Sequence, residues 1–198
     1  MWHLINNRQK MERRELDIIK KITEGEFHLF EEFVTQYYKK VYLICFGIVQ
    51  NKEDAEDLTQ EVFINAYSSL SKFKGGSTFS TWLYRISVNC SLELIRKRKR
   101  SPFFWKKETT KSEDQFYTID SLNNTAENDL IKKDEEKILA AAIASLPQKQ
   151  KIAIILSKYE KLSQKEIAQI MNLGEKAIES LLSRAKANLK KFFEINYR

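Results

Sequence analysis

The sequence has few of the residues that interrupt helices. Its 198 residues include only 5 glycines and 2 prolines, which disfavours a turn-rich sheet protein. Leu, Ile, Lys, Glu and Ala recur throughout, and these residues favour helices. The chain is longer than a typical single domain, so we expect an all-α fold of two small helical domains.

The chain also has few residues that bind metals or form disulfides. Cys45 and Cys90 lie among apolar neighbours, and His3 and His28 are far from both in the sequence, so no metal-ligand spacing exists. We expect two buried, reduced thiols, no metal and no cofactor. The N-terminus shows no apolar signal segment and the chain has no uninterrupted apolar run of membrane length. These absences predict a cytoplasmic protein with no direct membrane insertion.

The motifs of common enzyme classes are missing as well. The sequence has no phosphate-binding glycine loop and no pairing of histidine with a nucleophile, so we expect no enzymatic activity. What it does have is positive charge, with a net charge of +7. Basic residues outnumber acidic ones in residues 1–100 and 135–198, whereas residues 101–134 are slightly acidic. This distribution suggests two polyanion-binding surfaces joined by a connector.

Hydrophobic periodicity divides the N-terminal half into helices. Apolar residues at steps of three and four predict one helix over 27–48. A second helix begins after Asn51 as N-cap and ends near Lys72, before two glycines, and a third runs from about Phe79 to Arg100. The period fades in residues 101–134, which reads as a linker. Its three consecutive aromatics, 103–105, are expected to pack on a neighbouring domain, although partner docking or base stacking stays open.

The C-terminal half carries the strongest local signal. The helical pattern resumes at Glu135, and Pro147 is suited to the first turn of another helix. Ser163 and Glu166 form a capping box that starts a helix, residues 172–174 interrupt it, and a second helix follows with Ile178 facing inward. This is the pattern of a helix-turn-helix.

The outward face of that second helix mixes small and basic residues, as entry into a DNA major groove requires. A plain helical hairpin with a solvated face would show similar charge. The capping box, the turn and the small outward residues together favour DNA binding. The face and its flanks comprise Lys176, Ser180, Ser183, Ala187 and Lys190 with Arg184 and Lys186.

The start of the predicted second helix is strongly acidic. Asp54, Asp57 and Glu61 lie there with further carboxylates and Gln60, more acid than interaction with the helix dipole needs. Such a patch repels DNA. It is either a solvated helix start or a docking face for a basic protein, and the residues alone leave both readings open.

The predicted third helix carries two stripes. One is apolar and predicts a core face. The other combines an aromatic ring, an amide and cations, the mixture that grips phosphates and holds unstacked bases. This second stripe comprises Trp82, Arg85, Asn89, Glu93, Arg96 and Arg100, and the polar, glycine-containing loop 72–78 precedes it.

These stretches resemble a known family. Residues 54–63 (DAEDLTQEVF) and 79–89 (FSTWLYRISVN) closely resemble regions 2.2 to 2.4 of extracytoplasmic-function (ECF) RNA polymerase sigma factors of the sigma-70 family. Residues 146–147, 163–168 and 183–186 resemble region 4 of the same family. The resemblance implies that residues 1–100 form region 2, that 101–134 form the linker, and that 135–198 form the region 4 helix-turn-helix. It also implies a function in promoter recognition, DNA melting and transcription initiation.

The resemblance implies core RNA polymerase, promoter DNA and an anti-sigma factor as partners. It assigns polymerase binding to Asp54, Asp57, Gln60, Glu61 and Phe63. It assigns recognition and melting of the minus-ten element to Lys72, Lys74, Ser80, Thr81, Trp82, Arg85, Asn89, Arg96 and Lys97. It assigns the minus-thirty-five element to Ser163, Gln164, Lys176, Glu179, Ser180, Ser183, Arg184, Lys186 and Lys190. Melting would then be driven by binding, without nucleotide hydrolysis.

Three positions depart from the family's commoner pattern. Glu93 stands where aspartate is usual, and Glu179 and Leu181 stand where basic residues often lie. These departures leave the promoter sequence open. Two other protein classes compete with this reading. An ordinary helix-turn-helix regulator would not need the acidic face, and a single-strand binder would leave the helix-turn-helix unexplained.

Overall fold

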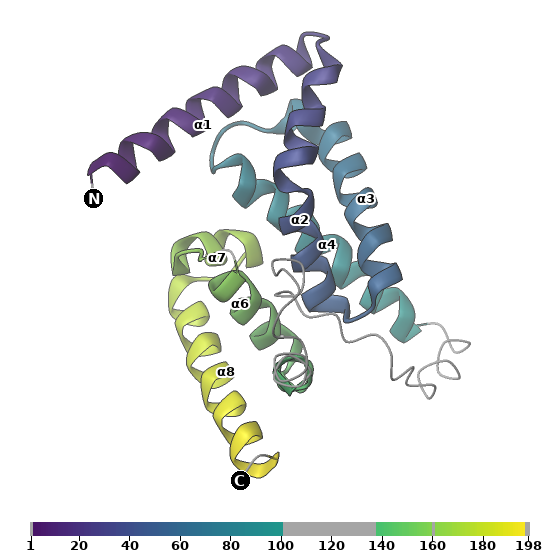
Figure 1. Cartoon of the computed structure of the whole chain (residues 1–198), viewed down its shortest axis with the longest axis vertical. Coiled ribbons are helices and arrows are strands. Elements are labelled where there is room, and N and C mark those ends of the chain that lie inside the picture. Colours follow the sequence, from purple (N-terminus) through teal and green to yellow (C-terminus); the bar gives the residue numbers. More distant parts are fainter. Residues whose placement is uncertain (1, 101–137, 160, 197–198) are drawn as a thin grey trace, which may run out of the picture.

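The computed structural model of the chain describes residues 2–100, 138–159 and 161–196. In these ranges the regular structure is helical throughout (Figure 1), which confirms the all-α prediction. The predictions for the linker 101–134 and for its aromatics 103–105 lie outside the described residues, as does the predicted helix start at Glu135.

The N-terminal half is built around three packed helices, α2 (Phe30–Val49), α3 (Lys52–Ser69) and α4 (Phe79–Arg100). The 3-10 turns η1 (Phe27–Leu29) and η2 (Leu70–Lys72) precede α2 and follow α3. Asn51 caps α3 as predicted, since its side chain accepts a hydrogen bond from the Asp54 amide at 2.9 Å. Thr78 serves α4 in the same way, with its Oγ1 3.1 Å from the Thr81 nitrogen. A further helix, α1 (Trp2–Thr23), reaches beyond this bundle (Figure 1).

The C-terminal half contains the predicted helix-turn-helix. A helical segment over 138–144 leads to α6 (Gln148–Tyr159), and α7 (Gln164–Met171) and α8 (Glu175–Asn196) follow. The capping box is present in full, because the Ser163 amide donates to Glu166 Oε2 at 2.9 Å and the Glu166 amide donates to Ser163 Oγ at 3.3 Å. Asn172 adopts a left-handed conformation with φ of 52° and ends α7.

The two halves pack against each other through α2 with α6 and α4 with α7. Their buried side chains form one continuous apolar cluster. Gly47 on α2 permits a close approach, because a Cβ added there would lie 2.9 Å from Ile155 Cδ1 on α6. Hydrophobic periodicity predicts an inward face for each helix but not this packing between halves.

The expected burial of both thiols is confirmed for Cys45 and Cys90. Within the described ranges, no three His, Cys, Asp or Glu side chains gather as a metal site would require. No helix in the part of the chain that the structure describes has the length and apolar character to cross a bilayer.

Candidate nucleic-acid and partner interfaces

The acidic face predicted for docking lies along the outer side of α3. Asp57, Gln60 and Glu61 are all exposed there. The same face continues along the helix with Ile64 and Tyr67, whose exposed fractions are 67% and 42%. Large apolar side chains at such exposure are candidates for protein contact. Neither residue belongs to the set predicted from the sequence, although they follow Gln60 by four and seven residues, a spacing that places them on that face.

Two residues of the predicted docking set are not presented to a partner. Phe63 is buried, and its ring lies parallel to that of Tyr38 with centroids 6.4 Å apart. Phe63 is thus a core residue of the bundle, and its assignment to polymerase contact stays a prediction. Asp54 forms an ion pair with the guanidinium of Arg98 and its side chain is only 16% exposed. This pair joins the start of α3 to the end of α4, so Asp54 acts within the bundle.

Six of the nine predicted minus-ten residues are exposed, on loop 72–78 and along α4. Ser80 is half-buried. Thr81 is buried, and its hydroxyl accepts a hydrogen bond from the Thr78 hydroxyl at 2.8 Å, so it offers no exposed surface. The exposed members are Lys72, Lys74, Arg85, Asn89, Arg96 and Lys97.

Trp82 is the main departure from the prediction of an accessible ring. Its side chain is only 9% exposed, and its ring packs on those of Phe73 and Phe79 with centroids 5.3 Å and 5.6 Å away. It lines a cleft of about 440 Å³ together with three nearby cations and with Gln169 and Asn172 of the α7 end. The indole is covered by the rings of Phe73 and Phe79, and the end of α7 lines the same cleft.

One carboxylate reduces the positive charge of the α4 stripe. Glu93 Oε1 lies 3.0 Å from Lys97 Nζ. The hydrogen bond between them and their opposite charges lower the pKa of Glu93 and raise that of Lys97. Both side chains are exposed, so Lys97 can exchange this carboxylate for a phosphate.

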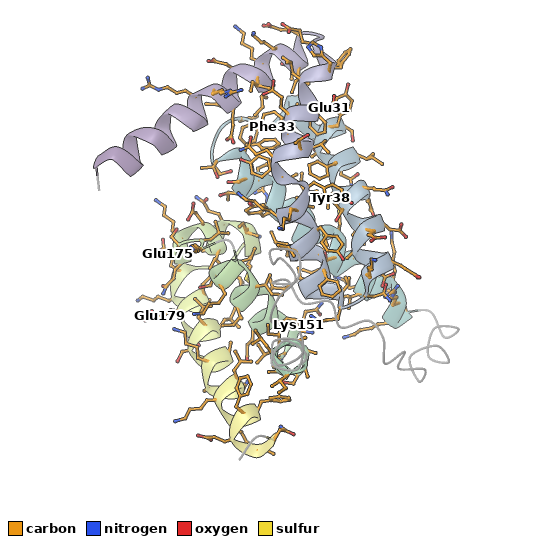
Figure 2. The ribbon with its side chains drawn as sticks, in the orientation of Figure 1. Glu31, Phe33, Tyr38, Lys151, Glu175 and Glu179 are labelled. Carbon is orange, nitrogen blue, oxygen red and sulfur yellow. The ribbon has the colours of Figure 1, made fainter. Side chains whose placement is uncertain are left out.

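The helix-turn-helix presents its predicted DNA face to solvent. All nine residues assigned to the minus-thirty-five element are exposed, whereas Ile178, Leu182 and Ala185 on the opposite side of α8 are buried. Glu175 and Glu179 lie on the outer side of the α8 start (Figure 2). Lys190 Nζ lies 3.7 Å from Glu194 within an exposed pair. The face itself is confirmed as exposed, and its contacts with DNA stay a prediction.

Comparison with known proteins identifies the architecture. The sigma-70 region 2 family matches residues 33–101, and the sigma-70 region 4 family matches residues 136–189. The ECF RNA polymerase sigma factor SigW of Bacillus subtilis is 30% identical over 87% of this chain and 93% of its own length. The chain belongs to the ECF sigma factors of the sigma-70 family. As an ECF sigma factor it directs RNA polymerase in promoter-dependent transcription initiation.

Other ECF sigma factors extend the comparison. The sigma-E factor of Haemophilus influenzae is 32% identical over 85% of this chain and 89% of its own length. These relatives are transcription initiation factors rather than enzymes. Among solved structures, CnrH in complex with the cytosolic domain of CnrY gives a TM-score of 0.63 at 21% identity, covering 90% of this chain and 96% of that one. RpoE of Bartonella quintana, in complex with the anti-sigma factor NepR, gives a TM-score of 0.62 at 23% identity, covering 84% of this chain and 98% of that one. These two likenesses support the fold.

Proposed function

We propose that the two halves of this sigma factor divide promoter recognition between them. Residues 1–100 bind core RNA polymerase and open the minus-ten element, residues 101–134 connect the halves, and residues 135–198 bind the minus-thirty-five element as duplex. The chain catalyses no reaction itself. The observation that carries this proposal is the separation of charge, since an acidic face on α3 and basic faces on α4 and α8 are exposed on different helices.

The polymerase-binding surface is the outer face of α3. Asp57, Gln60 and Glu61 supply charge that suits a basic partner. Ile64 and Tyr67 add apolar area next to these groups, and burial of such area supplies most of the affinity of a typical interface. A basic helical surface with an apolar seam is the kind of partner that fits this face.

Strand opening uses the loop 72–78 and the start of α4. Lys72, Lys74 and Arg85 are exposed and suited to phosphate contact. Trp82 reaches an unstacked base only after α7 moves away from it. Base stacking is worth about 1–3 kcal/mol per base, which is comparable to the cost of unpairing, so capture of the single strand can drive melting without nucleotide hydrolysis.

An anti-sigma factor is a further expected partner. CnrH and RpoE were both solved with a partner protein, which the RpoE structure names as an anti-sigma factor. The fold and length that this chain shares with them support a similar form of control.

Transcription with purified components tests the docking assignment. The double variant Asp57→Arg, Glu61→Arg places two cations where a basic partner binds, and like charges across an interface cost several kcal/mol. We expect at least about 100-fold weaker association with core polymerase, loss of run-off transcription and unchanged helical circular dichroism. Glu26→Arg, an exposed acid before η1, is the matched control. Wild-type affinity of the double variant would refute the docking face.

A further inference from the structure

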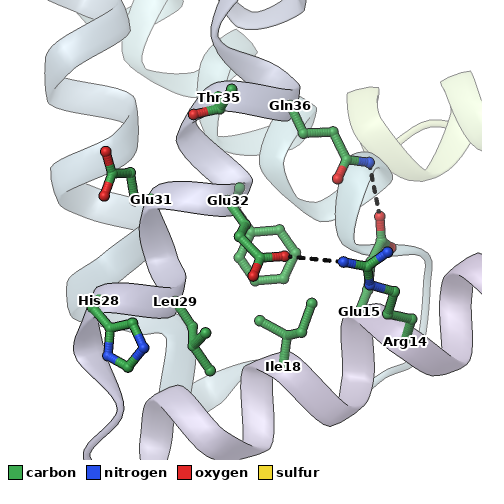
Figure 3. A pocket seen from close by; sticks show the side chains of 10 residues that line it. Arg14, Glu15, Ile18, His28, Leu29, Glu31, Glu32, Thr35 and Gln36 are labelled. Atoms are coloured by element: carbon green, nitrogen blue, oxygen red, sulfur yellow. Dashed lines mark hydrogen bonds and ion pairs between the residues drawn. The ribbon is translucent and has the colours of Figure 1, made fainter.

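Helix α1 precedes the residues that the region 2 family matches, and it holds an unexpected buried acid. Glu15 is only 8% exposed. Its Oε1 accepts a hydrogen bond from the Tyr37 hydroxyl at 2.5 Å and a longer one from Gln36 Nε2 at 3.5 Å. Figure 3 shows the side chains of α1 and α2 facing each other across a cavity of about 600 Å³, with Glu15 at its edge beside Gln36. Burying a carboxyl group is costly unless such partners are present.

The same turn of α1 touches the strand-opening loop. Glu15 and Leu16 line a cleft of about 290 Å³ whose other wall is formed by Phe73 and residues 75–79. Leu16 Cδ2 lies 3.6 Å from the position that a Cβ on Gly75 would occupy. Gly75 has φ of +70°, a conformation that other residues rarely adopt. The loop therefore turns at Gly75 and lies next to Leu16 of α1.

Tyr37, which donates the hydrogen bond to Glu15, also contacts the aromatic cluster around Trp82. The Tyr37 ring packs on Phe79, the first residue of α4, with centroids 5.6 Å apart. Phe79 in turn contacts Trp82 at 5.6 Å and Phe73 at 6.0 Å. Since Phe73 and Phe79 flank residues 74–78, this part of the loop is held at both ends by rings that pack on each other, and one of them packs on Tyr37.

We propose that Glu15 is a positioning residue for DNA strand opening. By accepting the Tyr37 hydrogen bond it holds α1 against loop 72–78 and positions the Tyr37 ring, which packs on Phe79 next to Trp82. It touches no DNA in this role. The inference rests on the proposed function, because it assumes that this loop and Trp82 capture the opened strand.

The test is open-complex formation by the full-length chain in holoenzyme, followed by permanganate reactivity of unpaired thymines. Glu15→Leu removes the acceptor, and Tyr37→Phe removes only the donating hydroxyl. We expect each to slow opening of a duplex promoter by about tenfold, the scale of one lost hydrogen bond to a carboxylate. On a template unpaired in advance over the minus-ten element, both variants should initiate at the wild-type rate. Glu15→Gln keeps an acceptor oxygen and should restore most of the opening rate on duplex.

Arg14→Ala is the matched control on the same helix. Arg14 pairs with Glu32 at 3.3 Å on the surface, and exposed pairs contribute little, so opening should not change. The proposal is overturned if Tyr37→Phe opens duplex as fast as wild type, or if its defect is equally large on the unpaired template. Both results differ from a failure of the proposed function, in which the wild-type chain would initiate on neither template.

Discussion

Cys45 lies in the centre of the N-terminal bundle, where desolvation raises the pKa of its thiol to about 12. Burial also raises the pKa of Cys90, whose sulfur accepts a hydrogen bond from Asn65 at 3.4 Å. The thiolate is the reactive form of cysteine. Neither side chain is therefore suited to redox sensing in the folded state.

We predict slow alkylation of both thiols in the native chain. At pH 8, reaction with a thiol reagent should be limited by unfolding, and it should become fast in denaturant. Because the pKa of the Cys45 thiol is raised in the folded chain, this thiol loses its proton first in the unfolded chain, above about pH 9. The free energy of unfolding therefore falls as pH rises toward 12. Rapid reaction of the folded chain at pH 8 would contradict the burial of these groups.

Asp54 gives a second test at this scale, because its contact with Arg98 is internal. Asp54→Asn removes the charge from a half-buried pair. We expect a loss of about 1–2 kcal/mol, which lowers the melting temperature by several degrees. Affinity for core polymerase should stay near the wild-type value, in contrast to changes at Asp57. Adding Arg98→Gln to Asp54→Asn should cost little further stability. A double-mutant cycle of thermal unfolding measures this coupling. Additive losses would show that the pair contributes nothing.

At the scale of elements, α7 is short and depends on its cap. A helix of 8 residues is marginal alone. Ser163→Ala removes the side-chain acceptor of the capping box and should cost about 1 kcal/mol, read as a lower urea midpoint with an unchanged slope. Ser163→Asn retains an N-cap acceptor and should keep the midpoint near wild type. If both variants behave alike, the cap does not stabilise α7.

The α8 face makes a separate prediction about salt. Arg184 and Lys190 are exposed on the outer side of α8. Replacing either with alanine should weaken binding to duplex that carries the minus-thirty-five element, and the slope of log affinity against log salt should fall by about 1 per cation. Lys161→Ala, an exposed cation before α7, serves as the control. An unchanged slope would remove that residue from the phosphate contacts.

How much of the structure the sequence predicts differs from element to element. The helix-turn-helix and the α3 acid face were predicted correctly because capping, turn residues and periodicity are local signals. The role of α1 could not be predicted, since Glu15 resembles any solvated acid until Tyr37 is placed beside it. Trp82 was expected to be accessible, but its ring packs on Phe73 and Phe79, and its cleft is shared with α7, which lies far along the chain. Contacts between distant segments leave no periodic signal in either segment.

At the scale of the whole molecule, the packing of the two halves limits what the chain can do. Gln169 and Asn172 of the helix-turn-helix line the same cleft as Trp82 and Arg85. The two promoter elements are separated by about two turns of duplex, roughly 70 Å. One promoter therefore cannot bind both surfaces while the halves remain packed together. Residues 101–134 can span up to about 110 Å when extended, so the halves can separate that far.

Gly47 and Ile155 provide a direct test of this separation. Gly47→Ala favours the helical state of α2, yet its Cβ would lie 2.9 Å from Ile155 Cδ1 on a fully buried side chain. Overpacking of this kind costs about 1–3 kcal/mol, so the variant should shift the free chain toward separated halves. Ile155→Val deletes that Cδ1, and the double variant should pack again. Fluorescent labels at introduced cysteines replacing Ser68 and Lys191 report the distance between the halves.

Energy transfer between those labels should fall in Gly47→Ala, recover in the double variant, and fall in all forms when core polymerase binds. The buried native thiols leave the introduced ones as the reactive sites. Because Trp82 and the end of α7 line the same cleft in the closed form, Gly47→Ala should also bind a single-stranded minus-ten oligonucleotide more tightly than wild type, by the same factor that its open population rises. If energy transfer and oligonucleotide affinity do not change together, the packing of the halves does not control access to the strand-opening surface.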